Sequence, residues 1–339
     1  MAAIHRFRVV RTLDLTALCF PERNFKAALV AAQRAMRQLK KNMFVRPFIT
    51  DRKQHVYGLT PAGAQQLHEQ GLVGTASVRR VADMTNPEHL LWANFLVMCC
   101  EARGLSALTE TELLRDARLK SKGTSAGHGQ TNAPAMPSLM DVPQAAGSSK
   151  HWRLRPDAIC YEPDGATWFE VDRSRRGADR VAKLGGLIRC IGRSLKNGES
   201  LRRVILFAKT ARVWNTDLAA LRSVGIELRP DAKPPVGDPP GTVYYTEAPQ
   251  TEAKVRCFTI SGFRKHRQAD GRTAERLEVL GYVIVQVLPL NLARFRVDVR
   301  NREGCNGWFD ENYLPYARPV GMAPWAVPTS PLLEGEGCW

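Results

Sequence analysis

The chain has 339 residues, enough for two or three domains, and its 49 Lys and Arg against 33 Asp and Glu give a formal net charge of +16. This excess favours a polyanionic partner, above all nucleic acid, although a merely soluble basic protein has the same balance. The eight Cys form no Cys-x-x-Cys pair, and the longest apolar run, residues 90–100, is too short to cross a bilayer. With basic residues also interrupting any N-terminal signal core, we expect a protein of the reducing cytoplasm, with no structural zinc and no membrane span.

Residues 1–85 have the pattern of a winged helix-turn-helix. Helical stretches are predicted over 13–20 and 24–42, followed by two strands over 44–49 and 55–59. Thr60 is placed to cap a further helix, with Pro61 at its first position. The order helix, helix, hairpin, helix therefore predicts a DNA-binding domain whose second helix enters the major groove.

The basic residues of this segment support that prediction. Between Arg23 and Lys53 there are nine Lys and Arg against one acid. A mixed, solvated surface has a more even balance, but a small helical bundle with a charged outer face is the alternative. The residues predicted to contact double-stranded DNA are Arg23, Lys26, Arg34, Arg37, Lys40 and Lys41 on the helix, and Arg52 and Lys53 in the hairpin loop.

The next two segments connect this domain to the rest of the chain. Residues 86–119 are predicted to be a helical connector, with an apolar helix over 87–103 and a capping box from Thr109 to Glu112. Residues 120–150 contain Gly, Ser, Ala, Pro, Asn and Gln without periodicity, which predicts a flexible linker.

Residues 151–230 alternate strands and helices. Strands are predicted over 157–161, 166–172, 203–208 and 225–228. Helices are predicted over 177–196 and 215–224, the first with a basic flank. The order strand, strand, helix, strand, helix, strand is that of a minimal nuclease core.

Three acids on the first two of these strands form the candidate active site. Glu170 and Asp172 point to the same side of a strand, and an antiparallel hairpin brings Asp157 towards them. Converging carboxylates are ligands for Mg²⁺ or Mn²⁺, and metal-dependent phosphodiester cleavage uses such a site. The alternative is a solvated turn with ordinary surface acids.

The C-terminal third is predicted to be rich in strands. Residues 231–252 form a Pro- and Gly-rich linker, and residues 253–318 a small β-rich domain. Residues 307–314 are similar to the closing segment of a Src-homology-3-like barrel. The Pro-rich residues 319–339 are predicted to be a loosely held tail.

Several of these motifs together resemble the replication-relaxation family of plasmids and integrative elements. They are Tyr57-Gly58-Leu59-Thr60-Pro61-Ala62-Gly63, the helix opened by His89, Arg155-Pro156-Asp157 and Glu170-Val171-Asp172-Arg173. The resemblance implies an α+β multidomain protein, with a winged helix fused to a restriction-endonuclease-like domain of the PD-(D/E)xK type. It also implies roles in plasmid replication, DNA relaxation and mobile-element maintenance. The expected location is the bacterial cytoplasm, in association with the nucleoid or a plasmid.

The sequence departs from the family's motif at one position. Asp157 and Glu170 match its two acids, but Asp172 stands where Lys is expected. In such nucleases the Lys helps to orient water and stabilises the developing negative charge. Lys183 on the following helix is the leading replacement, ahead of Arg173 and Arg180, or else the domain has kept its shape and lost catalysis.

Three functions follow from these observations. The first is a DNA-binding protein with a metal-dependent endonuclease or nickase domain. The second is a non-catalytic DNA-binding regulator or a replication or relaxosome accessory factor. The third is a scaffold subunit of a mobile-element or defence complex. Besides double-stranded DNA, the candidate partners of the chain are a second copy of itself and other mobile-element proteins.

Overall fold

The computed structural model describes residues 1–23, 25–50, 55–72, 87–115, 138–144, 149–172, 179–228, 242–249, 254–267, 272–288 and 315–326. The chain divides into two units, the first built mainly from Met1–Thr109 and the second from Glu110–Leu288 with Tyr316–Pro324. None of the helices in the described part of the chain is long and apolar enough to cross a membrane.

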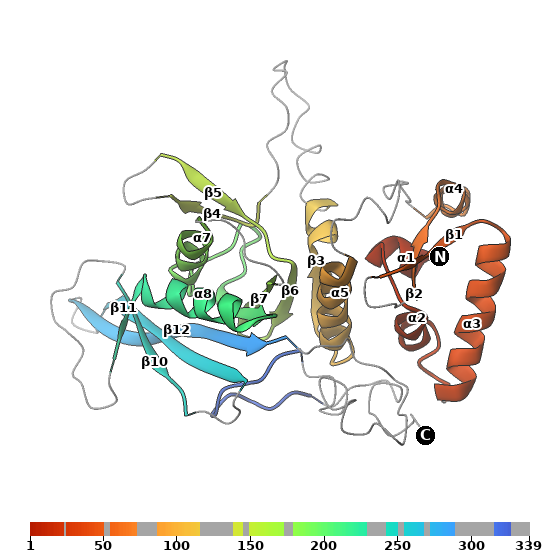
Figure 1. Ribbon diagram of the computed structural model, residues 1–339. Helices are drawn as coiled ribbons and strands as arrows, with labels where there is room; N and C mark the ends of the chain where they lie inside the picture. The colour runs from red at the N-terminus through yellow and green to blue at the C-terminus, as the bar shows by residue number, and fades with distance from the viewer. Residues whose placement is uncertain are drawn as a thin grey trace, which may run out of the picture. The chain divides into compact units, whose positions relative to one another are not determined.

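The first unit contains helices and a short hairpin (Figure 1). Its elements are α1 (Ala2–Phe7), α2 (Thr12–Cys19), α3 (Phe25–Lys41), β1 (Val45–Ile49), β2 (His55–Leu59), α4 (Pro61–Glu69), α5 (Pro87–Glu101) and β3 (Ser106–Thr109). β1 and β2 are antiparallel, and Val10 adds a bridge to Tyr57 of β2. The helices and hairpin expected within residues 13–69 are therefore present, while α1 and β3 were not expected.

The turn into α4 explains the Leu-Thr-Pro-x-Gly motif. The Thr60 hydroxyl accepts a hydrogen bond of 3.0 Å from the Gly63 amide and donates one of 2.7 Å to the Met43 carbonyl. It therefore caps α4 and also ties it to the end of α3. A Cβ at position 63 would lie 2.1 Å from the Phe44 carbonyl oxygen, so only glycine fits this approach.

The helix α5 belongs to the core of the first unit. Every residue from Leu91 to Cys100 is buried, and the Asn94 amide donates hydrogen bonds of 2.9 Å to the carbonyls of both Phe7 and Val9. Arg6 of α1 also forms an ion pair with Glu101. The segment expected to be a connector is thus packed here, because an apolar helix must bury its whole surface.

The second unit is built around one mixed sheet with helices packed on it. Its elements are β4 (Met140–Pro143), β5 (His151–Leu154), β6 (Ala158–Glu162), β7 (Gly165–Asp172), α7 (Asp179–Ile188), β8 (Leu201–Ala208), α8 (Ala211–Arg222), β9 (Gly225–Glu227), β10 (Val243–Glu247), β11 (Val255–Arg267) and β12 (Thr273–Val287). The strands follow the order β6-β7-β8-β12-β11-β10-β9. β7, β8 and β12 run parallel, and the pairs β6–β7, β12–β11 and β11–β10 are antiparallel.

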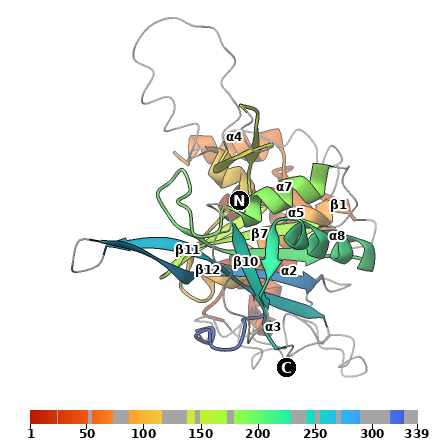
Figure 2. The same cartoon turned by 90° about the vertical axis from the view of Figure 1, so that its left-hand side faces the viewer.

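The centre of this sheet is apolar on both sides. Val204, Ile205, Leu206 and Phe207 of β8 are all fully buried, as expected for a strand that lies between two parallel neighbours. Helices α7 and α8 lie over the same face of the sheet in Figure 1 and in the turned view of Figure 2. The order of elements expected for residues 157–228 is therefore present, although α7 ends at Ile188 and not at residue 196.

Two expectations about the second unit were wrong. Residues 120–150 were expected to be a linker, but β4 lies within them. Its backbone pairs with that of β5 in an antiparallel arrangement. Residues 253–318 were expected to form a separate β-rich domain, but β12 pairs with β8 and extends the central sheet. The Src-homology-3-like segment 307–314 lies outside the described residues.

Candidate active site and nucleic-acid interface

Asp157 and Glu170 come together at the end of the β6–β7 hairpin. Ala158 pairs with Phe169, and continuing this register by one residue sets Asp157 opposite Glu170. The Val171 amide donates a hydrogen bond of 2.7 Å to Oδ2 of Asp157, which holds this carboxylate against the backbone of β7. The hairpin therefore sets Asp157, which directly precedes β6, opposite Glu170 of β7.

Glu170 is a buried carboxylate with two side-chain donors. Trp168 Nε1 donates a hydrogen bond of 2.8 Å to Oε1, and both terminal nitrogens of Arg180 lie 3.2 Å from Oε2. The side chains of Glu170 and Arg180 are only 10% and 12% exposed. A buried carboxylate needs pairing and hydrogen bonds, and Trp168 and Arg180 supply both to Glu170.

The structure places Arg180 beside Glu170, a residue that the sequence ranked behind Lys183. Arg180 lies in the first turn of α7, which begins at Asp179 and carries it to β7. Lys183 follows three residues later on the same helix and is half-buried. The sequence ranked Lys183 first because the nuclease motif calls for Lys, whereas the start of α7 decides which side chain reaches Glu170.

Asp172 is the last residue of β7 and pairs with Ala208, but its side chain lies outside the described part of the structure. Among the described residues, no three His, Cys, Asp or Glu side chains form a group that could hold a metal ion. Asp157 and Glu170 are oxygen ligands of the kind that Mg²⁺ or Mn²⁺ takes. A metal here would share Glu170 with Arg180, whose guanidinium already binds Oε2.

The basic residues predicted on α3 form one exposed face. Ala28, Ala32 and Met36 recur every four residues and are buried. The predicted DNA contacts in and beside the helix are all exposed: Arg23, Lys26, Arg34, Arg37, Lys40 and Lys41. Helical periodicity thus separates an apolar inner stripe from a basic outer surface. Arg52 and Lys53 lie outside the described residues.

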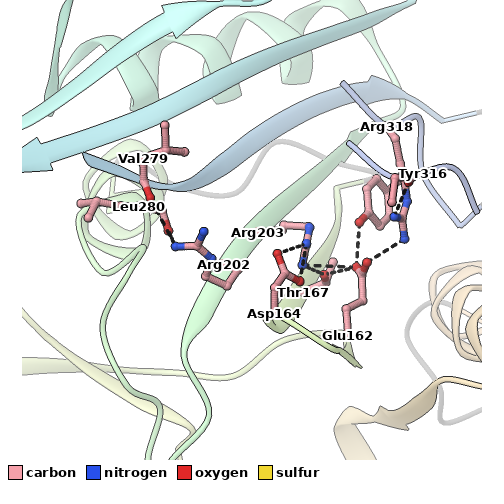
Figure 3. Close-up of polar contacts among 10 residues, drawn as sticks. Glu162, Asp164, Thr167, Arg202, Arg203, Val279, Leu280, Tyr316 and Arg318 are labelled. Atoms are coloured by element: carbon pink, nitrogen blue, oxygen red, sulfur yellow. Dashed lines mark hydrogen bonds and ion pairs between the residues drawn. The ribbon is translucent and has the colours of Figure 1, made fainter. Parts of the chain in front are cut away.

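A second polar cluster, missed by the sequence analysis, lies at the other end of the β6–β7 hairpin (Figure 3). Glu162 is buried, and its Oε1 accepts hydrogen bonds of 2.6 Å from Thr167 and 2.7 Å from Tyr316. Arg318 donates to Oε2 at 2.7 Å, and Arg203 lies 3.5 Å from Oε1. We call these five residues the Glu162 cluster. It fastens residues 316–318 to the sheet.

Burial and charge perturb the groups around this cluster. Burial, together with the negative charge of Glu162, raises the pKa of Tyr316 well above its ordinary value, so the phenol stays protonated. Burial would raise the pKa of Asp164, but the hydrogen bonds and charge of Arg203 outweigh it and lower that pKa. Tyr316 and Arg318 lie more than 150 residues from Glu162 in sequence, so no local pattern could have linked them.

Alternation along β7 separates this cluster from the acidic site. Thr167 and Trp168 are adjacent in the strand, so their side chains point to opposite faces of the sheet. Thr167 binds Glu162, and Trp168 binds Glu170. The sheet therefore carries a structural polar cluster on one face and the Asp157–Glu170–Arg180 site on the other.

Comparison with known proteins identifies one match. The family model described as replication-relaxation matches residues 1–187, which is more than half of the chain and includes α3, Asp157, Glu170 and Arg180. No curated protein and no solved structure matches.

Proposed function

The chain belongs to the replication-relaxation family, whose members are associated with the replication of mobile elements, and we propose that it binds duplex DNA through α3 and the β1–β2 hairpin. The basic outer face of α3 is the observation that carries this proposal. Six exposed Lys and Arg lie in or just before a helix whose opposite stripe is buried. A helix of this kind fits the major groove and neutralises phosphates on either side of it.

The elements around α3 support a winged-helix assignment. α2 and α3 precede an antiparallel hairpin, and a single bridge joins Val10, before α2, to Tyr57 of β2. In such a domain the hairpin is the wing, and its loop reaches the DNA backbone. The cap at Thr60 binds the end of α3 to α4, which keeps helix and hairpin in a fixed arrangement.

The test is the salt dependence of binding by the full chain. A variant with Arg34→Ala, Arg37→Ala and Lys41→Ala, the α3 variant, removes three exposed cations from one helix face. Its slope of log affinity against log salt for a short duplex should be smaller by about 2 to 3, because each phosphate contact contributes about 0.9. Fluorescence anisotropy between about 50 and 200 mM NaCl measures this slope.

A matched control separates local contacts from net charge. The control variant carries Arg153→Ala, Arg212→Ala and Arg222→Ala, three exposed positions of the second unit. It should keep the wild-type slope. The proposed role of α3 would be contradicted if the slope fell equally in both variants, or if the wild-type chain did not bind DNA.

A second candidate function is metal-dependent cleavage of one DNA strand. Its support is that Asp157, just before β6, lies opposite Glu170 of β7, with Arg180 beside Glu170. The two carboxylates would hold Mg²⁺ or Mn²⁺, which supplies a Lewis acid for phosphodiester cleavage when bound. Arg180 provides a fixed positive charge near the phosphate, the role that Lys has in the related motif. A non-catalytic regulator with the same fold is the alternative.

Removal of the metal tests this second function. Supercoiled plasmid incubated with the protein and Mg²⁺ should be converted to the nicked form, and excess EDTA should reduce conversion to the protein-free background. Adding Mg²⁺ or Mn²⁺ back should restore it. If nicking persists in EDTA, or if no nicking occurs with either metal, the cleavage function is contradicted and only the DNA-binding function remains.

A further inference from the structure

The hairpin of β11 and β12 continues far past the rest of the sheet. β10 pairs with β11 as far as Ser261, and β8 pairs with β12 from Tyr282 onwards. Beyond these points, residues 262–267 and 273–278 pair with each other, and among the described strands with no third one. Figure 2 shows the two strands running out from the body of the second unit. We call this two-stranded projection the β-arm.

The base of the β-arm is held in a defined direction. The register shifts between Ile260 and Ser261, and a bulge of this kind re-aims the strands that follow it. Arg202 donates to the Leu280 carbonyl (Figure 3), and Arg264 donates a hydrogen bond of 2.7 Å to the Gly192 carbonyl. A Cβ at Gly281 would lie 2.0 Å from the Arg202 carbonyl oxygen, so the strands pack closely there. The arm is therefore anchored where it leaves the sheet.

The charge of the β-arm is unbalanced. Its basic residues are Arg264, Lys265, Arg267 and Arg276, and Arg272 directly precedes its second strand. All five are exposed. Its acids are Glu275 and Glu278, with Asp270 between the two strands in the sequence, and Glu278 lies 2.8 Å from His266. Arg264 and Arg276 are direct cross-strand partners, and like charges in such a pair destabilise a sheet. The cost of this pairing falls when a polyanion lies along the ribbon.

An exposed ribbon also needs protection from pairing with other strands, and charged side chains provide it. Charged residues of either sign serve that purpose, whereas residues 264–278 carry five Lys and Arg against three Asp and Glu, an excess that protection alone does not require. A two-stranded ribbon has the width of the DNA major groove, and several DNA-binding proteins use one. Shape and charge thus point to the same partner.

We propose that the β-arm is a second contact with duplex DNA, separate from α3. This inference rests on the proposed DNA-binding function and adds to it a surface in the other unit of the chain. Lys265, Arg267 and Arg276 supply positive charge to the phosphates, while Arg264 also positions the arm through Gly192. The chain then contacts DNA through two separate elements.

The test uses the full chain with Lys265→Ala, Arg267→Ala and Arg276→Ala, compared with wild type, the α3 variant and the control variant. The slope of log affinity against log salt should be smaller by about 2 to 3 in this arm variant. A charge-conserving version with Lys265→Arg, Arg267→Lys and Arg276→Lys should return to the wild-type slope. Thermal unfolding of each variant confirms that the three exposed substitutions leave the fold intact.

The outcomes separate the two proposals. If the arm variant binds like wild type while the α3 variant is impaired, the β-arm inference is overturned and the proposed function stands. The inference is also overturned if the control variant loses as much slope as the arm variant. If the wild-type chain does not bind duplex DNA, both proposals fail.

Discussion

Replacing Glu162 by Ala should lower the free energy of unfolding by about 3 to 5 kcal/mol, the range found when one partner of a buried ion pair is removed. Both carboxylate oxygens are in use, with Thr167 and Tyr316 on Oε1 and Arg318 on Oε2. The side chains of Glu162 and Arg203 are each only 3% exposed. The substitution therefore leaves buried donors without their acceptor, and water has little access to replace it.

Urea unfolding followed by circular dichroism measures this loss. Glu199→Ala is the matched control, because Glu199 is an exposed carboxylate of the same unit, and it should change stability by less than about 0.5 kcal/mol. Tyr316→Phe keeps the ring and removes one hydrogen bond, so it should cost about 1 kcal/mol. Equal stability of Glu162→Ala and Glu199→Ala would show that the Glu162 cluster does not hold residues 316–318 to the sheet.

The second large effect is expected in the candidate active site. If the chain nicks DNA, Asp157→Ala and Arg180→Ala should each slow Mg²⁺-dependent nicking by about 100-fold or more. Asp157 is a proposed metal ligand, and Arg180 forms an ion pair with Glu170. Lys183→Ala should have a much smaller effect, because Arg180 remains beside the acids.

Initial rates of plasmid nicking under single-turnover conditions measure this difference. Arg180→Lys keeps a positive charge but loses the two-pronged contact with Oε2, so its rate should lie between those of wild type and Arg180→Ala. Arg153→Ala removes an exposed cation of the same unit and should cut at the wild-type rate. A severe loss in Lys183→Ala with normal cutting by Arg180→Ala would reverse the assignment. Unfolding curves must accompany these rates, since Arg180 is buried.

The residues around Asp157 and Glu170 were only partly predictable from the sequence. Asp157 and Glu170 could be found because a short turn joins their strands, and hairpin pairing follows from local sequence. Trp168 precedes Glu170 by two residues, so alternation along a strand puts both on one face, but it does not show that the indole donates to the carboxylate. Whether Arg180 reaches Glu170 depends on where α7 begins, and the exact start of a helix is poorly determined by composition.

The sequence by itself determined the local elements of the first unit. The spacing of Ala32 and Met36, the basic residues on the other face of the same helix and the Thr60-Pro61 cap are local signals, and α3 and α4 form as they predict. The tertiary structure alone decided how distant strands combine. β12 pairs with β8 across more than seventy residues, and Tyr316 and Arg318 reach Glu162 from near the end of the chain. Such contacts depend on burial and register in the folded sheet, which no short stretch of sequence contains.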